Sequence, residues 1–127
     1  MNNLFREKGF TLIEVLIGVI ILAIGVLAIA GMQITSTRGT SFSNNLMQAS
    51  YAAQDRLEFL KNTDFGDGLL SYGSHADGTV TSSGVVYNRA YTVAPDPAGS
   101  GYKLITFVVT WNDGVDHNIS FSTIRSQ

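Results

Sequence analysis

The chain has 127 residues, enough for one ordinary domain, and it contains no cysteine. The lack of thiols excludes a disulfide framework and thiol chemistry, but it does not fix the compartment, since exported proteins need no disulfides. The formal net charge of -2 at pH 7 comes from scattered charges, which provide no basic surface for nucleic acid. Hydrophobic residues are concentrated in the first quarter of the chain, so the N-terminal region carries most of the information.

A short polar segment, MNNLFREKG, precedes a long apolar run, FTLIEVLIGVIILAIGVLAIAGM, that extends from Phe10 to Met32. As a helix this run would be about 34 Å long at roughly 1.5 Å per residue, which is enough to cross a bilayer. Arg6 and Lys8 predict that the N-terminus stays cytoplasmic while the rest of the chain is exported. Two alternatives are a discarded secretory signal, whose apolar core would be shorter, and a plain single-span protein that stays uncleaved.

Glu14 is the only charged residue in the apolar run. A carboxylate inside a membrane helix costs about 2.5–3.5 kcal/mol on insertion scales. If the chain starts at Met1, Glu14 can lie near the interface and reach the lipid headgroups. If the chain starts at Phe10, a new α-ammonium lies one helical turn away, and a carboxylate in the first turn also complements the helix dipole. In a helix bundle Glu14 would then favour the arrangement that supplies a cation, from its own terminus or from a neighbour's.

The string KGFTLIE, from Lys8 to Glu14, resembles the processing motif of type IV prepilins and pseudopilins. The resemblance implies that residues 1–9 are a basic leader, removed on the cytoplasmic side by a membrane prepilin peptidase that cuts between Gly9 and Phe10. It also implies that the same enzyme N-methylates Phe10, the new terminus. Glu14 is then the acidic residue that guides assembly.

The run AIGVLAIAGMQ, from Ala23 to Gln33, looks more narrowly like minor pilins of the PilV kind. Many major pilins carry a proline about two-thirds of the way along the apolar run, where this chain has Gly31. Glycine weakens a helix by about 1 kcal/mol relative to alanine without forcing a kink. This departure favours a minor subunit over the bulk subunit of a filament shaft.

The resemblance also implies a location and partners. Residues 10–32 would cross the bacterial inner membrane once and later form part of a filament core. Residues 33–127 would be an exported head, displayed on the pilus or cell surface. The implied partners are the prepilin peptidase with its N-methyltransferase activity, the inner membrane before assembly, and other major and minor pilins packed through their helices.

Beyond the apolar run, the polar stretch from Gln33 to Asn45 has poor helix propensity and predicts a weak or partly melted section of one long helix. An amphipathic helix is predicted at about 46–61, packed on its own domain. Apolar side chains recur there at spacings of three and four residues. They are Leu46, Ala49, Ala53, Leu57 and Leu60.

Residues 62–84 are rich in glycine and aspartate and predict an irregular loop with one short strand at Thr79–Thr81. Calcium is conceivable at Asp64, Asp67 and Asp77, since hard cations take oxygen ligands. The spacing matches no EF-hand loop, however, and aspartate and glycine are ordinary turn residues. No metal site is therefore predicted.

Three runs with period-two alternation predict strands at about 85–94, 103–111 and 117–124. Asn112-Asp113-Gly114 predicts a tight hairpin between the last two, and residues 95–101 form a longer connection between the first two. The resulting antiparallel meander would cover the apolar stripe of the helix. The predicted fold is α+β and type IV pilin-like, with a long N-terminal helix, transmembrane in its first half, packed on a small antiparallel β-meander.

No catalytic residue and no cofactor are predicted. His75 and His117 have no metal-ligand spacing, and Asp116 with His117 is expected to be a solvated pair. The sequence has no nucleophile elbow and no phosphate-binding glycine loop. The predicted function is therefore structural, that of a minor type IV pilin incorporated into a surface pilus or priming its assembly. The alternatives are a pseudopilin of a type II secretion or DNA-uptake system and a pilus-displayed adhesin or binding module, with nucleic acid disfavoured by the scattered positive charges.

Overall fold

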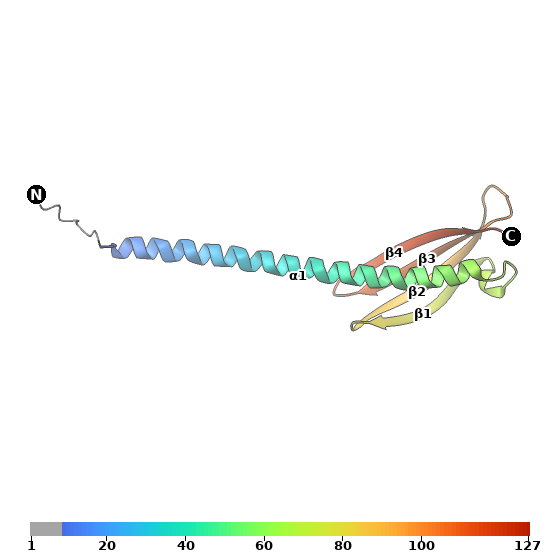
Figure 1. Cartoon of the computed structure of the whole chain (residues 1–127), viewed down its shortest axis with the longest axis horizontal. Coiled ribbons are helices and arrows are strands. Elements are labelled where there is room, and N and C mark those ends of the chain that lie inside the picture. Colours follow the sequence, from blue (N-terminus) through green and yellow to red (C-terminus); the bar gives the residue numbers. More distant parts are fainter. Residues whose placement is uncertain (1–8) are drawn as a thin grey trace, which may run out of the picture. The chain divides into compact units, whose positions relative to one another are not determined.

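The computed structural model describes residues 9–127, so the predictions for Arg6, Lys8 and most of the leader lie outside the described residues. One long helix, α1, spans Leu12–Asn62, and a short 3-10 helix, η1, spans Gly68–Leu70. Four strands follow in the order β1 (Gly73–Ser82), β2 (Val85–Pro95), β3 (Lys103–Asn112) and β4 (Asp116–Arg125) (Figure 1). The chain divides within α1 into two compact units. The first ends at Ser41 and the second begins at Phe42.

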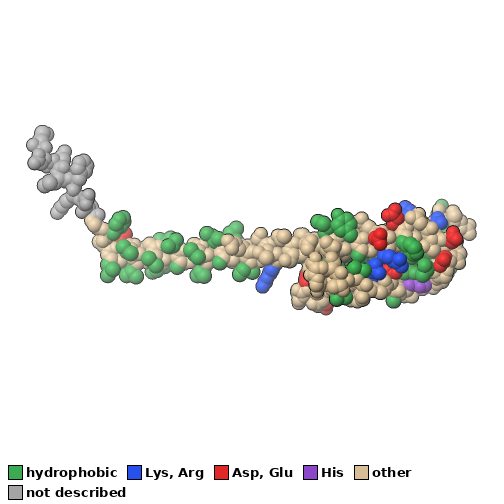
Figure 2. Space-filling model, turned by 60° about the horizontal axis from the view of Figure 1, so that its bottom comes forward, with side chains coloured by type: hydrophobic (Ala, Val, Ile, Leu, Met, Phe, Trp, Pro, Cys, Tyr) green, Lys and Arg blue, Asp and Glu red, His purple; other side chains and the backbone are tan. Residues whose placement is uncertain are grey.

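In the first unit, α1 exposes every side chain from Leu12 to Ser41. Hydrophobic side chains predominate along it, whereas charged side chains gather on the second unit (Figure 2). By length and composition, α1 is the one helix within residues 9–127 that could cross a membrane, with a mean hydropathy of 3.0 in its most apolar window. None of that window is buried in the chain, which distinguishes it from the core helix of a soluble domain.

The polar section of α1, predicted to be a weak or partly melted part of one long helix, is helical throughout. The hydroxyl groups of Thr35, Thr37 and Thr40 donate hydrogen bonds of 3.2, 2.9 and 3.0 Å to the carbonyl oxygens four residues earlier. Threonine hydroxyls bonded in this way can bend a helix and slightly destabilise it, but α1 continues through all three residues. The low propensity of these residues therefore does not interrupt the helix.

The second unit contains a four-stranded antiparallel sheet in the order β1-β2-β3-β4. The α+β fold class predicted from the sequence, one long apolar helix with an antiparallel meander, is confirmed. β2, β3 and β4 differ from the predicted strand ranges by no more than one residue at each end. The β3–β4 hairpin turns through Asp113, Gly114 and Val115, because Asn112 still pairs with Asp116.

The prediction for β1 was too short, since the strand covers Gly73–Ser82 and not only Thr79–Thr81. A β-bulge between Ala76 and Thr79 shifts its register against β2. Gly78 within the bulge has φ +75°, a left-handed conformation that glycine adopts without steric cost. A bulge adds a residue and breaks the alternation of side chains, so the pattern that identifies the other strands is missing here.

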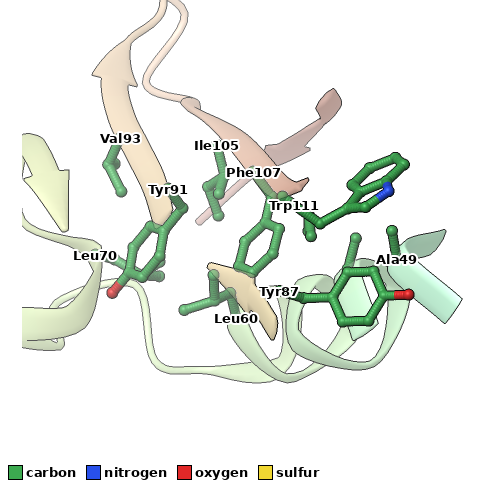
Figure 3. Close-up of a cluster of buried hydrophobic side chains, with 11 residues drawn as sticks. Ala49, Leu60, Leu70, Tyr87, Tyr91, Val93, Ile105, Phe107 and Trp111 are labelled. Atoms are coloured by element: carbon green, nitrogen blue, oxygen red, sulfur yellow. The ribbon is translucent and has the colours of Figure 1, made fainter. Parts of the chain in front are cut away.

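The hydrophobic core lies between α1 and one face of the sheet (Figure 3). Ala49, Ala53 and Leu60 of α1 are fully buried, which confirms that the predicted apolar stripe packs on its own domain. The two alanines leave room for large side chains of the sheet, and Leu70 of η1 also joins the cluster. The buried side chains of the sheet are Tyr87, Tyr91, Val93, Ile105, Phe107, Val109 and Trp111.

Candidate functional site

The peptide bond between Gly9 and Phe10, where the motif predicts cleavage, lies outside α1, which begins at Leu12. Both residues are exposed, and the Phe10 side chain is 81% accessible. The position of a Cβ on Gly9 meets no atom within 4 Å. Protein backbone that is accessible and not held in a helix is the kind that proteases cut. The local structure is thus compatible with the predicted cleavage.

Glu14 lies in the first turn of α1. Its backbone N–H donates to the carbonyl oxygen of Thr11 at 3.0 Å and lies 3.3 Å from the Thr11 hydroxyl oxygen, so Thr11 caps the helix. The Glu14 side chain is exposed and has no ion-pair partner among residues 9–127. A carboxylate at this end of a helix is favoured by the helix dipole and remains available for a cation.

A partly buried ion-pair network in the second unit was not predicted from the sequence. The guanidinium Nε of Arg56 on α1 lies 3.0 and 2.9 Å from the two carboxylate oxygens of Asp77, which is in the bulge of β1. Arg89 on β2 donates to the Asp77 carbonyl oxygen at 2.9 Å, and its Nε lies 3.4 Å from the carboxylate. The hydrogen bond from Arg56 to Asp77 raises the pKa of Arg56. This network ties α1 to the bulged edge of the sheet.

A second polar cluster joins α1 to the β3–β4 hairpin. Asn45 donates a hydrogen bond of 2.9 Å to Asp113, whose other carboxylate oxygen lies 2.9 Å from Nε2 of His117. The hydrogen bond from Asn45 lowers the pKa of Asp113. Asp116, which was expected with His117 to be a solvated pair, is exposed and accepts a hydrogen bond from Asn112 at 2.6 Å.

His117 is also placed by aromatic contacts. Its ring stacks on Trp111 with centroids 5.2 Å apart and lies 5.0 Å from the ring of Phe42. The ring therefore takes part in side-chain packing, and its Nε2 contacts the carboxylate of Asp113. None of these contacts places His117 beside a hydroxyl or thiol that it could activate as a general base.

Two of the three aspartates considered for calcium, Asp67 and Asp77, have other side-chain contacts. Asp67 caps η1 by accepting a hydrogen bond of 2.8 Å from the backbone of Leu69. Asp77 is engaged by Arg56 and Arg89. Within the described residues, no three side chains of His, Cys, Asp or Glu come together in a way that could hold a metal ion.

Comparison with known proteins gives one match. Residues 4–30 match a family model described as a prokaryotic N-terminal methylation motif. No curated protein and no solved structure matches the chain. The matched segment includes Gly9, Phe10 and Glu14 and most of the apolar part of α1. The motif supports a type IV pilin or pseudopilin.

Proposed function

We propose that the chain is a minor type IV pilin, a structural subunit that is incorporated into a surface pilus or primes its assembly. The observation that carries the proposal is the methylation motif at residues 4–30, placed at the start of a long, exposed, apolar helix. The α+β head that follows has no constellation of nucleophile, base and orienting group among its described residues. A structural role is therefore favoured over an enzymatic one.

Processing is proposed to begin with hydrolysis of the peptide bond between Gly9 and Phe10 by the prepilin peptidase. The cut releases residues 1–9 and creates an α-amine on Phe10, which the enzyme then methylates. Before the cut, the basic leader holds the N-terminus in the cytoplasm, residues 10–32 cross the inner membrane, and the head is exported. After it, the helix leaves the bilayer and packs with those of other pilins.

Glu14 is proposed to direct this packing. The new terminus at Phe10 lies four residues before Glu14, about one helical turn away. In the apolar interior of a bundle a lone carboxylate is costly, so it favours the position in which an α-ammonium, its own or a neighbour's, lies beside it. The exposed and unpaired state of Glu14 in the single chain is consistent with this role.

A minor pilin, of the PilV kind, is favoured over a major one by the sequence of the apolar run, which has Gly31 where many major pilins have proline. α1 continues through Gly31, and a Cβ at that position would meet no atom within 4 Å. The helix therefore has neither the proline of many major pilins nor a break in its place. A pseudopilin of a secretion or DNA-uptake system shares the same processing and is the main rival.

N-terminal mass spectrometry separates these readings. Filaments sheared from the cell surface and the membrane fraction would be analysed side by side. A minor pilin predicts an N-methylated Phe10 terminus in the sheared material. Processed protein confined to the membrane fraction would favour a pseudopilin, and an intact Met1 terminus in every fraction would refute the proposal.

Substitution of Glu14 tests the assembly step separately from cleavage. Glu14→Gln keeps the size of the side chain and removes its charge, whereas Glu14→Asp keeps the charge. We expect Glu14→Gln to be cleaved normally and to be lost from sheared filaments, with Glu14→Asp retaining partial incorporation. Normal incorporation of Glu14→Gln would show that pairing with an ammonium is not required.

A further inference from the structure

The two edges of the sheet differ in a way that matters for partner binding. The free edge of β1 is interrupted by the bulge, where Asp77 turns inward and is buried between two arginines. Bulges and inward-pointing charges are two of the devices by which proteins block the pairing of edge strands. β4 has no bulge, because its register with β3 is unbroken from Asp116 to Arg125. Its inward-pointing charge, Arg125, is the last residue of the strand and donates to the carbonyl oxygen of Thr63 at 3.4 Å. Residues 118–124 carry no charge, so β4 is the less protected edge.

Two pockets flank β4, one on each face of the sheet. The inner pocket, about 360 Å³, lies between α1 and β4 and is lined by Leu57, Lys61 and Thr123 among others. The outer pocket, about 220 Å³, is mainly apolar and is lined by Tyr102 and Ile124 among others. Thr123 and Ile124 are consecutive residues that point to opposite faces. The inner pocket is otherwise lined by α1, and the outer one by β3 and the β2–β3 connection, so each pocket borders one of two consecutive positions of the edge strand.

We propose that β4 is the docking edge for an extended strand of a different protein subunit, which pairs antiparallel with β4 and becomes a fifth strand of the sheet. In strand addition, main-chain hydrogen bonds provide affinity and pockets for alternate side chains provide specificity. This inference concerns the head and does not depend on processing at Gly9.

The lining of the pockets defines the chemistry of the partner strand. The partner strand carries an aliphatic side chain opposite Ile124, since the outer pocket is mainly apolar. Opposite Thr123 it carries a long neutral polar side chain, because Glu58 and Lys61 both line the inner pocket. Opposite the half-buried Phe121 it carries a further apolar side chain, and on the outer face near Ser122 it is polar.

A second copy of this chain fits the edge poorly. When two copies join their β4 strands antiparallel in one sheet, residues that lie opposite each other have their side chains on the same face. If Ser120 of one copy lies opposite Ser120 of the other, Asp116 lies opposite Ile124 at the apolar outer pocket. If Phe121 lies opposite Phe121, Asn118 lies opposite Ile124. Both central registers bring a polar group to a pocket that suits an aliphatic one.

The test uses a capped octapeptide, Thr-Leu-Gln-Thr-Val-Thr-Val-Thr, whose sequence follows from the pairing above when its first residue lies opposite Arg125. The full chain in detergent micelles is exposed to deuterated buffer with and without the peptide, and exchange is followed by mass spectrometry. We expect added protection of amides in Asp116–Arg125 and none in Gly73–Ser82. The same peptide is also appended after Gln127 through a Gly/Ser linker, which raises its effective concentration to the mM range.

Backbone methylation distinguishes strand pairing from side-chain binding in a groove. In an antiparallel pair, alternate N–H groups of a strand face its neighbour. Two versions of the peptide, N-methylated at the odd or at the even positions, should therefore differ, one losing protection of β4 and the other retaining it. Equal behaviour of the two versions would overturn strand addition.

Variants of the chain test the two pockets. Thr123→Lys in the inner pocket and Ile124→Asp in the outer pocket should each weaken peptide binding by about tenfold or more. Thr81→Lys, an exposed change of the same kind on β1, is the matched control and should bind as the parent does. Fluorescence of Trp111 checks that each variant is folded.

Two results would refute the inference. If even the appended peptide gives β4 no protection, the edge does not accept a strand. If β4 is protected without peptide in a way that grows with protein concentration, a second copy covers it and the partner is not a different subunit.

Discussion

Removing the carboxylate of Asp77 should destabilise the head strongly. Its side chain is only 6% exposed, and Arg89 beside it is 16% exposed. The Nε of Arg89 is buried and has no hydrogen-bond partner even in the intact protein. In Asp77→Ala the Arg89 guanidinium loses the anion that compensates its burial. Arg56, which is 27% exposed, loses the same anion.

The expected cost is about 2–3 kcal/mol. Breaking a fully buried ion pair by removing one partner costs roughly 3–5 kcal/mol. The exposure of Arg56 lets water screen part of its charge, which moves the expected cost just below that range. The free energy of unfolding of a small domain is only about 5–15 kcal/mol, so the effect should be plain.

The assay is denaturant unfolding of the full chain at a fixed detergent concentration. Trp111 is the only tryptophan in the sequence and is 3% exposed, so its fluorescence reports on the head core. Asp64→Ala is the matched control, since Asp64 is an exposed carboxylate in the loop after α1. It should change the free energy of unfolding by no more than about 0.5 kcal/mol.

A double-mutant cycle then assigns the cost to the network. Asp77→Ala and Arg89→Ala should be non-additive, because the second change removes the charge that the first leaves uncompensated. A cost of Asp77→Ala no greater than that of Asp64→Ala would contradict a stabilising role of the Asp77 carboxylate. Simple additivity of Asp77→Ala and Arg89→Ala would show that the two side chains are not coupled.

Three further predictions concern the core, acid stability and processing. Leu60→Ala should lower the free energy of unfolding by about 2–5 kcal/mol in the same fluorescence assay, since the Leu60 side chain is fully buried between α1 and the sheet. A cost below about 1 kcal/mol would contradict that packing. The pKa of Asp113 is lowered in the folded state, so its stabilisation is present above the ordinary carboxyl pKa of about 3.9 and is lost as pH falls through the lower folded value. Asp113→Asn should therefore flatten the loss of stability below about pH 4, measured by unfolding at a series of pH values, and an unchanged pH profile would contradict it. Gly9→Val should retain Met1 in N-terminal mass spectrometry, because a branched side chain beside the cut would obstruct the peptidase, and normal cleavage of this variant would contradict the proposed site.

The elements with regular patterns could be predicted from the sequence. The stripe that includes Ala49 and Leu60 has the helical period, and β2 to β4 alternate their side chains, so both signals are local and survive in a single sequence. β1 was largely missed because its bulge breaks that alternation. One long helix was predicted, but its threonine-rich section was expected to be weak because its propensity is poor, whereas α1 is helical throughout.

The candidate processing site was readable because its motif is contiguous. The polar networks of the head were not, because their partners are far apart in the chain. Asp77 meets Arg56 across 21 positions, and Asp113 meets Asn45 across 68. Nothing in the composition of a glycine-rich loop marks one aspartate as buried, and only the fold decides which arginine reaches it.

The threonines of α1 have a consequence for how deeply the helix can lie in an apolar medium. Since Thr35, Thr37 and Thr40 donate their hydroxyl hydrogens to the backbone, these side chains present mainly methyl groups to the surroundings. The section after Met32 is therefore less hydrophilic than its amino-acid composition indicates. The first strong barrier to deeper insertion is Arg38, whose long side chain can still reach toward the headgroups. The helix thus tolerates a range of depths, which suits an element that must travel between a bilayer and a protein bundle.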